Sequence, residues 1–388
     1  MINKELLTKR IFEVIERKHL EEVLKSGKKL RIKYGADPTA PDLHLGHAVV
    51  FRKLKEFQDL GHTIIFIIGD YTALIGDPSG RSKARPMLSE KEIKANAATY
   101  FKQVGKILDV KKTEIVYNSG WFKKEDLAST IKLMAKFTIQ RVLERDDFSK
   151  RIKEGAEVYA HEILYPMMQA YDSVMIKADV EVGGTDQKFN MLAGRDLQRH
   201  MGISEQDVIT IPLLVGIDGV KKMSKSVGNY IGISEEPEIM FGKLMSIPDE
   251  LILKYAELLT DLPLDELNKK ISSDPRGAKM DLAKEIVKIY HSDKDAKKAE
   301  EEFVRVVSNK EIPEKVESVR LKVKEIKLID LLVETKMASS KGEARRLIEQ
   351  GGVKIDNEKQ SDPNKIISLD KKIILQVGKH KFLTVSDK

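Results

Sequence analysis

The sequence predicts an α/β fold, in which a doubly wound parallel-sheet (Rossmann-like) catalytic domain precedes an all-helical domain and a small α+β module. Short apolar segments alternate with amphipathic ones over residues 1–230. Residues 231–320 show helical periodicity and no convincing strand, and glycine-punctuated, strand-like runs occur near the end. Strand, helix, strand repeats are typical of a parallel sheet with helical crossovers.

Five segments are predicted strands of this sheet. The two clearest are apolar runs that end in Gly or Ala and Asp, at 30–37 and 62–70, and a helical stripe of apolar residues at 47–60 lies between them. Weaker candidates follow at 114–119, 173–179 and 207–216. Ligands of such sheets bind at the carboxyl ends of the strands, so functional side chains are expected there.

The composition excludes several classes of protein. Cysteine is absent from the 388 residues, which excludes a disulfide framework, a thiolate nucleophile and a zinc site built on sulfur. No apolar run approaches the length that spans a bilayer, so we expect a cytoplasmic protein without a membrane segment. The formal net charge of +7 permits a polyanionic partner without requiring one.

Two histidines flank a glycine where the helix 47–60 is predicted to begin. A helix start offers unpaired backbone N–H groups, Gly46 allows close approach, and the imidazoles of His44 and His47 donate N–H bonds to phosphate. Asp37 and Thr39 precede this point in a turn, where they would contact the nucleotide or cap the helix, and we expect capping from Thr39. The segment therefore indicates a nucleotide-phosphate site.

A second basic segment, KKMSKS (221–226), follows the strand predicted at 207–216. Lys222, Lys225 and the serines Ser224 and Ser226 would offer cations and hydroxyls to a triphosphate from a mobile loop. Taken alone, the string is equally typical of a solvated basic loop. Its occurrence with the histidine motif in one alternating α/β chain favours the nucleotide site.

Three polar side chains share one face of a predicted helix within YPMMQAYD (165–172). Tyr165, Gln169 and Asp172 are spaced i, i+4, i+7. Pro166 indicates that the helix starts or kinks there. Without the other motifs, these three side chains would be interpreted as ordinary solvent-exposed residues of a helix.

The motifs HLGH and KMSKS resemble the signatures of class I aminoacyl-tRNA synthetases, and YPMMQAYD, GGTDQ and LIGDPSGR are similar to those of the bacterial-type tyrosyl-tRNA synthetase family. The resemblance implies ATP-dependent attachment of tyrosine to tRNA(Tyr) in two steps, through a tyrosyl-adenylate. ATP with Mg²⁺ would be a co-substrate, with no tightly bound cofactor and no metal held by the protein. It also implies a homodimer with its interface around residues 120–165.

The same resemblance implies roles for individual residues. It implies catalytic contacts to the nucleotide for His44, His47, Lys222 and Lys225. It implies further ATP contacts for Asp37, Thr39, Gly46, Asp186, Leu213, Leu214, Met223, Ser224 and Ser226, with Asp186 on the ribose and the leucine backbone at adenine. It implies a tyrosine pocket of Asp77, Tyr165, Gln169, Asp172 and Gln187, in which Asp172 accepts the phenol hydrogen bond.

One position departs from the family pattern. A tyrosine that contacts the substrate phenol in one branch is replaced here by Lys33, and Tyr34 follows it. The roles of both residues stay open, and we expect Lys33→Ala to have only a modest effect.

The carboxyl-terminal residues 326–388 resemble a small RNA-binding module, with 13 Lys and Arg against 9 Asp and Glu. Its basic helix places Ser340, Lys341, Arg345 and Arg346 where they would contact an RNA backbone. By the same resemblance, residues 231–320 would bind the anticodon.

Two other interpretations remain. A tryptophanyl-tRNA synthetase shares the fold and both signatures, but the Tyr165, Gln169 and Asp172 set and the terminal module argue against it. A catalytically inactive synthetase-like RNA-binding protein would not need His44 and His47 together with both KMSKS lysines.

Overall fold

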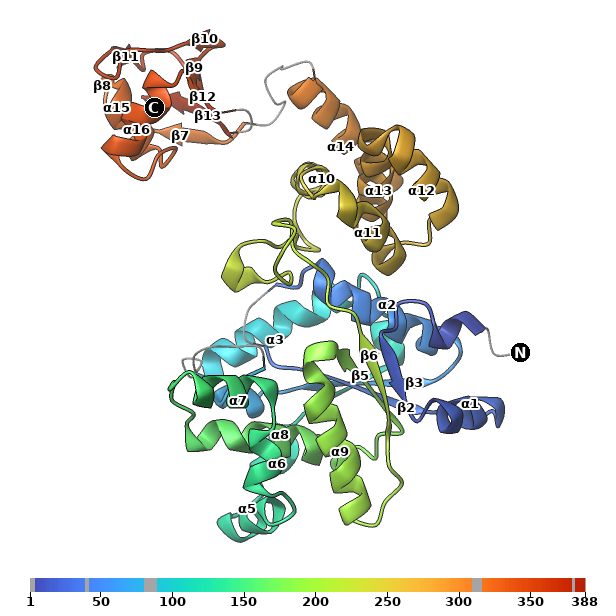
Figure 1. Cartoon of the computed structure of the whole chain (residues 1–388). Helices are drawn as coiled ribbons and strands as arrows, with labels where there is room; N and C mark the ends of the chain where they lie inside the picture. The colour runs from blue at the N-terminus through green and yellow to red at the C-terminus, as the bar shows by residue number, and fades with distance from the viewer. Residues whose placement is uncertain (1–3, 39–41, 80–88, 309–315, 379–380, 388) are drawn as a thin grey trace. The chain divides into compact units, whose positions relative to one another are not determined.

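The computed structural model describes residues 4–38, 42–79, 89–308, 316–378 and 381–387. The chain divides into two compact units, Met1–Ser292 and Asp293–Lys388, whose elements are labelled in Figure 1. The three functional domains expected from the sequence stay a prediction, since packing alone assigns no function.

A six-stranded sheet forms the core of the first unit, in the order β1-β6-β5-β2-β3-β4. Its pairs are parallel except that β1 runs antiparallel to β6. The strands are β1 (Glu13–Ile15), β2 (Arg31–Ala36), β3 (Thr63–Ile68), β4 (Thr113–Tyr117), β5 (Val180–Gly184) and β6 (Asp207–Ile211). The strand order reverses between β2 and β5, so the predicted doubly wound sheet is confirmed and its switch point lies there.

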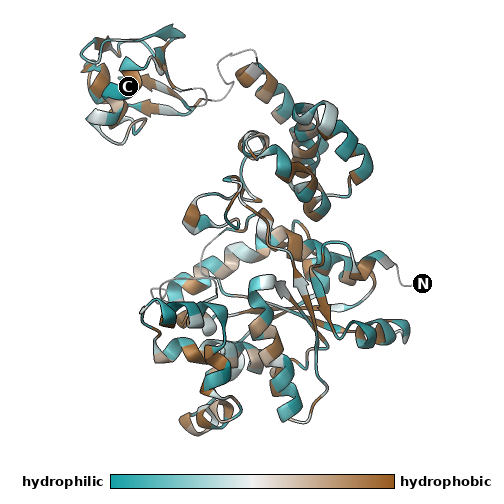
Figure 2. Cartoon of the chain, viewed as in Figure 1, coloured by the Kyte–Doolittle hydropathy of each residue, from teal (hydrophilic) through white to brown (hydrophobic). Residues whose placement is uncertain are grey.

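The strands carry the core of this unit. In β3 every residue after Thr63 is buried, and four of its six residues are isoleucine, as expected of a central parallel strand covered on both faces. Figure 2 shows this hydrophobic centre. Helix α2 (Leu45–Asp59) contacts β3 and β5, while α9 (Lys188–His200) contacts β5, β6 and α8 (Ala160–Met175).

The remaining α-helices of the first unit lie between the strands and after β6. They are α1 (Arg17–Lys25), α3 (Glu90–Val104), α4 (Ser119–Phe122), α5 (Leu127–Met134), α6 (Ile139–Leu143), α7 (Asp146–Lys153), α10 (Pro237–Met245), α11 (Ile252–Leu259), α12 (Leu264–Ser273) and α13 (Pro275–Tyr290). Helix α11 contacts α2, so this helical region packs onto the sheet domain within one unit.

The strand predicted at 173–179 is wrong. Its apolar residues form the last turn of α8, and β5 begins at Val180 after Lys177 adopts a positive φ of 50°. A three-residue apolar run cannot distinguish a helix end from a strand. Pro166 also does not start the helix, because α8 runs through it from Ala160.

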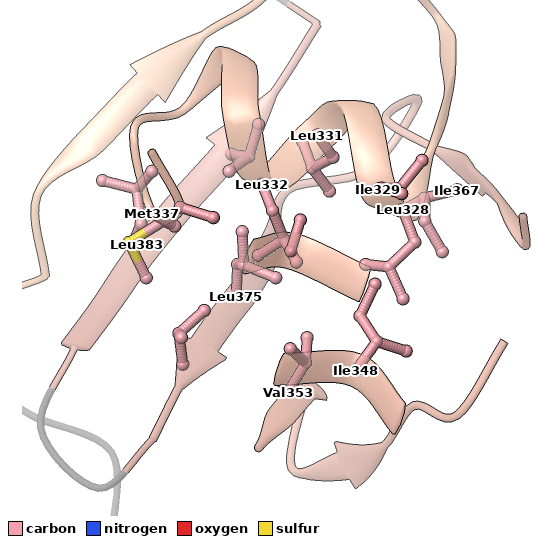
Figure 3. Packing of buried hydrophobic residues seen from close by; sticks show 14 of the residues in the cluster. Leu328, Ile329, Leu331, Leu332, Met337, Ile348, Val353, Ile367, Leu375 and Leu383 are labelled. Atoms are coloured by element: carbon pink, nitrogen blue, oxygen red, sulfur yellow. The ribbon is translucent and has the colours of Figure 1, made fainter. Parts of the chain in front are cut away.

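The second unit contains α14 (Asp293–Phe303), a π-helical turn (Val304–Ser308) and the terminal module. The module consists of β7 (Ser318–Arg320), β8 (Glu325–Lys327), α15 (Leu328–Glu334), α16 (Lys341–Glu349), β9 (Val353–Ile355), β10 (Glu358–Lys359), β11 (Ile366–Ser368), β12 (Ile373–Val377) and β13 (Lys381–Ser386). Its buried core joins both helices to the sheet (Figure 3).

Strand β7 pairs with β13, and β8 pairs with β11. The expectation of helices alone over 231–320 is therefore wrong at its end, because β7 belongs to the module sheet. A strand of three residues is too short to show an alternating pattern in the sequence. Across the described ranges, no helix is long and apolar enough to cross a membrane.

Candidate active site

A cavity of about 1200 Å³ lies in the first unit, at the carboxyl ends of β2 and β5. It brings together almost every residue expected to bind ATP or tyrosine. Its walls include Asp37, His44, Gly46, His47, Asp77, Tyr165, Gln169, Asp172, Asp186, Gln187, Leu213, Leu214, Lys222, Met223, Ser224, Lys225 and Ser226. Thr39 lies outside the described residues.

The two histidines stand at the start of α2 and are neutral. Burial lowers the pKa of His44 to about 2, and the neighbouring His47, Lys225 and Lys222 disfavour its protonated form further. Burial and Lys225 lower the pKa of His47 to about 4. The backbone N–H of His44 donates to Nδ1 of His47 at 3.3 Å, so the proton of the neutral His47 ring sits on Nε2. Neutral rings donate N–H bonds without adding charge of their own.

Gly46 makes room for the His44 ring. A Cβ at this position would lie 3.0 Å from both Cε1 and Nδ1 of His44, and 3.7 Å from Cβ of Met223. The sequence suggested that Gly46 admits a ligand, whereas the closest neighbours are these two side chains. The glycine thus sets the position of a predicted catalytic residue.

Asp37 connects the end of β2 to α8. Its Oδ2 accepts from the Tyr165 hydroxyl at 2.9 Å, and its Oδ1 accepts from the Thr72 hydroxyl at 2.8 Å. A Cβ on Gly69 would lie 2.1 Å from Asp37 Oδ1, so only glycine fits beside this carboxylate. Tyr165 and Asp37, expected in different subsites, therefore share a hydrogen bond.

Asp172 is a buried carboxylate held by two side-chain donors. The Trp121 indole N–H donates to Oδ1 at 3.0 Å, and the Asn118 amide donates to Oδ2 at 3.3 Å. Burial raises its pKa to about 7, although Lys33 and the two donors oppose the rise. A carboxylate so removed from water needs hydrogen-bond donors, which makes it a suitable acceptor for a buried hydroxyl.

Asp77 and Gln187 also contact each other across the cavity. The Gln187 amide donates to Asp77 Oδ2 at 2.6 Å, and the backbone N–H of Ser79 donates to Oδ1 at 2.9 Å. The buried Arg145 lies 3.9 Å from Asp77 Oδ1 and donates to the Ser79 hydroxyl at 3.0 Å. This carboxylate faces a cavity in which an ammonium group would find a counter-ion.

The lysines of the KMSKS segment are paired with acidic residues at the cavity. Lys222 Nζ lies 2.8 Å from Asp186 Oδ2, and Lys225 Nζ lies 3.3 Å from Asp42 Oδ2 and 5.9 Å from the centre of the Tyr230 ring. Asp186 and Lys222, expected to hold the ribose and the phosphates, thus neutralise each other here.

Asn229 and Leu214 anchor this segment to the fold. The backbone N–H of Met223 donates to the Leu214 carbonyl at 2.7 Å, and that of Ser224 donates to Asn229 Oδ1 at 2.8 Å. The Asn229 amide in turn donates to Asp218 at 2.9 Å. The Leu214 carbonyl, expected at adenine, is therefore already bonded to the loop, while the Leu213 side chain is exposed.

Of the residues expected to bind RNA, Lys341, Arg345 and Arg346 lie on α16 in the second unit, and Ser340 directly precedes it. Ser340 caps the helix by accepting from the backbone N–H of Glu343 at 3.2 Å, and Lys341 pairs with Asp330 at 2.7 Å. Arg345 and Arg346 are exposed. Ser340 therefore has a structural role in capping the helix.

Sequence reasoning missed several residues of the cavity and its support, namely Asp42, Thr72, Asn118, Trp121, Glu181 and Asn229. Asn118 directly follows β4, so the strand-end rule would have found it. Glu181 is a charged residue inside an apolar strand, and the misplaced strand at 173–179 hid it. Across the described ranges, no group of three His, Asp or Glu side chains could hold a metal ion.

Comparison with protein families gives two matches that together span most of the chain. The family of class I tRNA synthetases for tryptophan and tyrosine matches residues 25–308. The C-terminal domain of SYY-like tyrosine–tRNA ligases matches residues 309–385.

Individual relatives agree with these matches. The chain is 52% identical to a tyrosine–tRNA ligase of Aquifex aeolicus over 96% of this chain and 95% of that one. It is 51% identical to a tyrosine–tRNA ligase of Thermotoga maritima, over 98% of this chain and 96% of that one. Among solved structures, a tyrosyl-tRNA synthetase from Archaeoglobus fulgidus, complexed with L-tyrosine, shares the fold with a TM-score of 0.63 at 24% identity, over 76% of this chain and 98% of that chain.

Replacing Asp172 by Asn should flatten the pH dependence of stability. Because its pKa is raised, the folded state binds more protons than the unfolded state between pH 3.8 and about pH 7. The free energy of unfolding of the wild-type protein therefore falls as the pH rises through this window. The Asn variant has no ionisable group at this position and so does not lose stability in this way. The slope of its free energy of unfolding against pH should therefore be less negative than that of the wild type, by up to about 1.4 kcal/mol per pH unit. Urea unfolding at a series of pH values measures both slopes, and equal slopes would contradict the burial of an ionisable group.

Replacing Gly46 by Ala should slow ATP-dependent activation of the amino acid without lowering stability. The new methyl group displaces the His44 ring by a fraction of an ångström, which should cost about tenfold in rate, while alanine is the better helix former. Gly242→Ala on α10 is the matched control, because nothing lies within 4 Å of its added Cβ. Equal rates for both variants would show that the His44 position does not matter.

Proposed function

The chain belongs to the tyrosine–tRNA ligase family of class I tRNA synthetases, and on that premise we propose that its cavity activates tyrosine with ATP and transfers it to tRNA(Tyr). The observation that carries this proposal is the meeting of the histidine motif, the KMSKS segment and the polar face of α8 around one cavity. The relatives at about half identity are ligases for tyrosine, which favours this function over the tryptophanyl alternative and over an inactive scaffold.

The first step needs no protein nucleophile. The carboxylate of tyrosine attacks the α-phosphorus of ATP, the bond to the β-phosphate oxygen breaks, and pyrophosphate leaves with the Mg²⁺ that ATP brought. His44 and His47 are neutral donors at the start of α2, where they would bond phosphate oxygens as charge moves onto pyrophosphate. Lys222 and Lys225 supply the cations. Positioning and electrostatic stabilisation thus provide the acceleration.

The pocket for tyrosine lies on the α8 side of the cavity. Asp77 would bind the α-ammonium with Tyr165 and Gln169, and the buried Asp172 would accept the phenol hydrogen bond. Phenylalanine lacks that hydroxyl and would leave Asp172 short of a donor in a buried site, which costs free energy. The Asp172 environment, with the Trp121 and Asn118 donors, supports this assignment.

In the second step, a ribose hydroxyl of the terminal adenosine of tRNA attacks the acyl carbon of the adenylate, and AMP leaves. We assign the binding of tRNA to the helical region 231–320 and to the terminal module. The exposed Arg345 and Arg346 on α16 suit an RNA backbone.

A homodimer is the proposed assembly, and the cytoplasm is the proposed location. Helix α5 exposes Leu127, Ile131 and Met134 at i, i+4, i+7 spacing, with 75%, 57% and 39% of each residue accessible, and Ile139 on α6 adds 53%. An exposed apolar stripe of this kind marks a contact surface. It lies within the segment 120–165 where the interface is expected.

The direct test of the proposed activity is amino-acid-dependent exchange of pyrophosphate into ATP, measured with each of the standard amino acids. Tyrosine should support exchange, and phenylalanine and tryptophan should not, because only tyrosine offers a hydroxyl to Asp172. Exchange with tryptophan would favour the alternative synthetase, and no exchange with any amino acid would favour an inactive scaffold.

Ending the chain at Ser308 should separate the two steps. All residues lining the cavity precede Gly228, and the deletion removes β7 and β8 with the rest of the module, whereas a cut at residue 326 would split it. We expect tyrosine-dependent exchange to persist and charging of tRNA to fall severely.

The same truncated preparation, checked for folding by circular dichroism, should also show a weaker dependence of tRNA affinity on salt than the full chain, because phosphate contacts release counter-ions. Undiminished charging would make the module a stability element, and lost exchange would show that it shapes the cavity.

A further inference from the structure

Resting on the proposed function, we propose that Lys33 and Glu181 form a positioning pair that fixes the phenol end of the tyrosine pocket and sets the preference for tyrosine over phenylalanine. Neither residue would touch the substrate through a hydrogen bond of its own. Both act through α8, the helix that carries Gln169 and Asp172.

The pair spans the switch point of the sheet. Lys33 on β2 is the register partner of Glu181 on β5, and Nζ lies 2.8 Å from Oε1. The two side chains are 0% and 2% exposed, yet both line the cavity. A buried ion pair at the boundary between the two halves of the sheet, beside a substrate pocket, calls for an explanation beyond packing, because an apolar pair of similar volume is often as stable.

All three N–H donors of the Lys33 ammonium are engaged. They point to the Gln169 carbonyl at 2.8 Å, the Ser173 hydroxyl at 2.7 Å and the Glu181 carboxylate at 2.8 Å. An ammonium has three donors and no acceptor, so none remains for a ligand. Lys33 therefore acts through the residues it holds.

Those residues enclose Asp172 on α8. Lys33 bonds the main chain at Gln169 and the side chain at Ser173, so it fixes the helix on both sides of Asp172. Glu181 accepts from the Gln169 side-chain amide at 3.1 Å and from the Ser173 hydroxyl at 3.2 Å. The pair thereby fixes the rotamer of Gln169 and the turn that presents Asp172.

The pair also sets the electrostatic environment of Asp172. The Lys33 ammonium opposes the rise in pKa that burial imposes on Asp172, whereas the Glu181 carboxylate adds to that rise. The other groups that act on Asp172 are the side chains of Asn118 and Trp121, which donate hydrogen bonds and do not titrate in the accessible range. The two members of the pair therefore act on Asp172 with opposite sign.

The contacts of Lys33 lead us to expect a larger effect of Lys33→Ala than the modest one expected from the sequence. Lys33 is fully buried, and its ammonium is the cation that pairs with Glu181. Substitution by alanine would leave the Glu181 charge buried without a cation, which is strongly unfavourable. Lys33→Met keeps the length of the side chain and is the better probe.

The experiment measures steady-state pyrophosphate exchange for Lys33→Met and Glu181→Gln. Lys33→Met should raise the KM for tyrosine by between about tenfold and about a hundredfold, the range that misplacement of a binding group produces. It should also reduce the ratio of kcat/KM for tyrosine over phenylalanine and leave the KM for ATP unchanged.

The pH profile supplies a readout that a merely structural role would not move. The acid limb of kcat/KM for tyrosine should shift to higher pH in Lys33→Met and to lower pH in Glu181→Gln, because the two side chains act on Asp172 in opposite directions. Shifts in the same direction, or none, would overturn the proposal. If Lys33→Met does not fold, the shift in Glu181→Gln alone decides the question.

Lys53→Met is the matched control. Lys53 on α2 is also 0% exposed, and it pairs with Glu56 and donates to the Leu6 carbonyl at 2.8 Å, away from the cavity walls. Its removal should lower stability and leave the KM for tyrosine and the amino-acid preference unchanged. An equal effect of both substitutions on tyrosine kinetics would show that loss of a buried cation, not the position of Lys33, is responsible. A wild-type chain without tyrosine-dependent exchange would instead refute the proposed function itself.

Discussion

The removal of charged groups from water is the constraint on which the cavity depends. Each buried ion costs several kcal/mol unless partners compensate it, and the carboxyl ends of β2 and β5 bring such groups together. Lys33 meets Glu181 across the sheet, and Asp172 is held by side chains that follow β4. The helix α8 crosses this region, so its polar face is fixed by partners on three different strands or strand ends. The pocket is therefore rigid, because each of these buried charged side chains is held in place by its ion pair or hydrogen bonds.

The parts of the fold that sequence could predict are those with strong local patterns. The segment TIIFII predicts a buried strand because its apolar residues are contiguous and β-branched, and α2 follows from a stripe of apolar residues at helical spacing. The functional segments were found because glycine, histidine and lysine occur in short strings. Sheet topology and the clustering of these strings at strand ends then follow from general rules of parallel sheets.

The supporting partners could not be predicted because they come from distant segments. Trp121 and Asn118 reach Asp172 from about one seventh of the chain away, and no local pattern marks an indole as a donor to a carboxylate. The apolar pattern at the end of α8 predicts a strand there, so Glu181 on the true strand β5 is not identified as the partner of Lys33. Gly46 shows a different limit: its place in the motif is evident from the sequence, but only the position of the His44 ring reveals that an added Cβ would crowd that ring.

The ion pair between Lys222 and Asp186 has a consequence for how mutational effects combine. The two residues satisfy each other, so under the roles proposed for them each would compete with a bound nucleotide for its partner. Removing one member would then lose its proposed contact to ATP and at the same time release the other from that competition. Their contributions to nucleotide affinity would therefore be non-additive, and the measured cost of either single substitution would understate the interaction it removes.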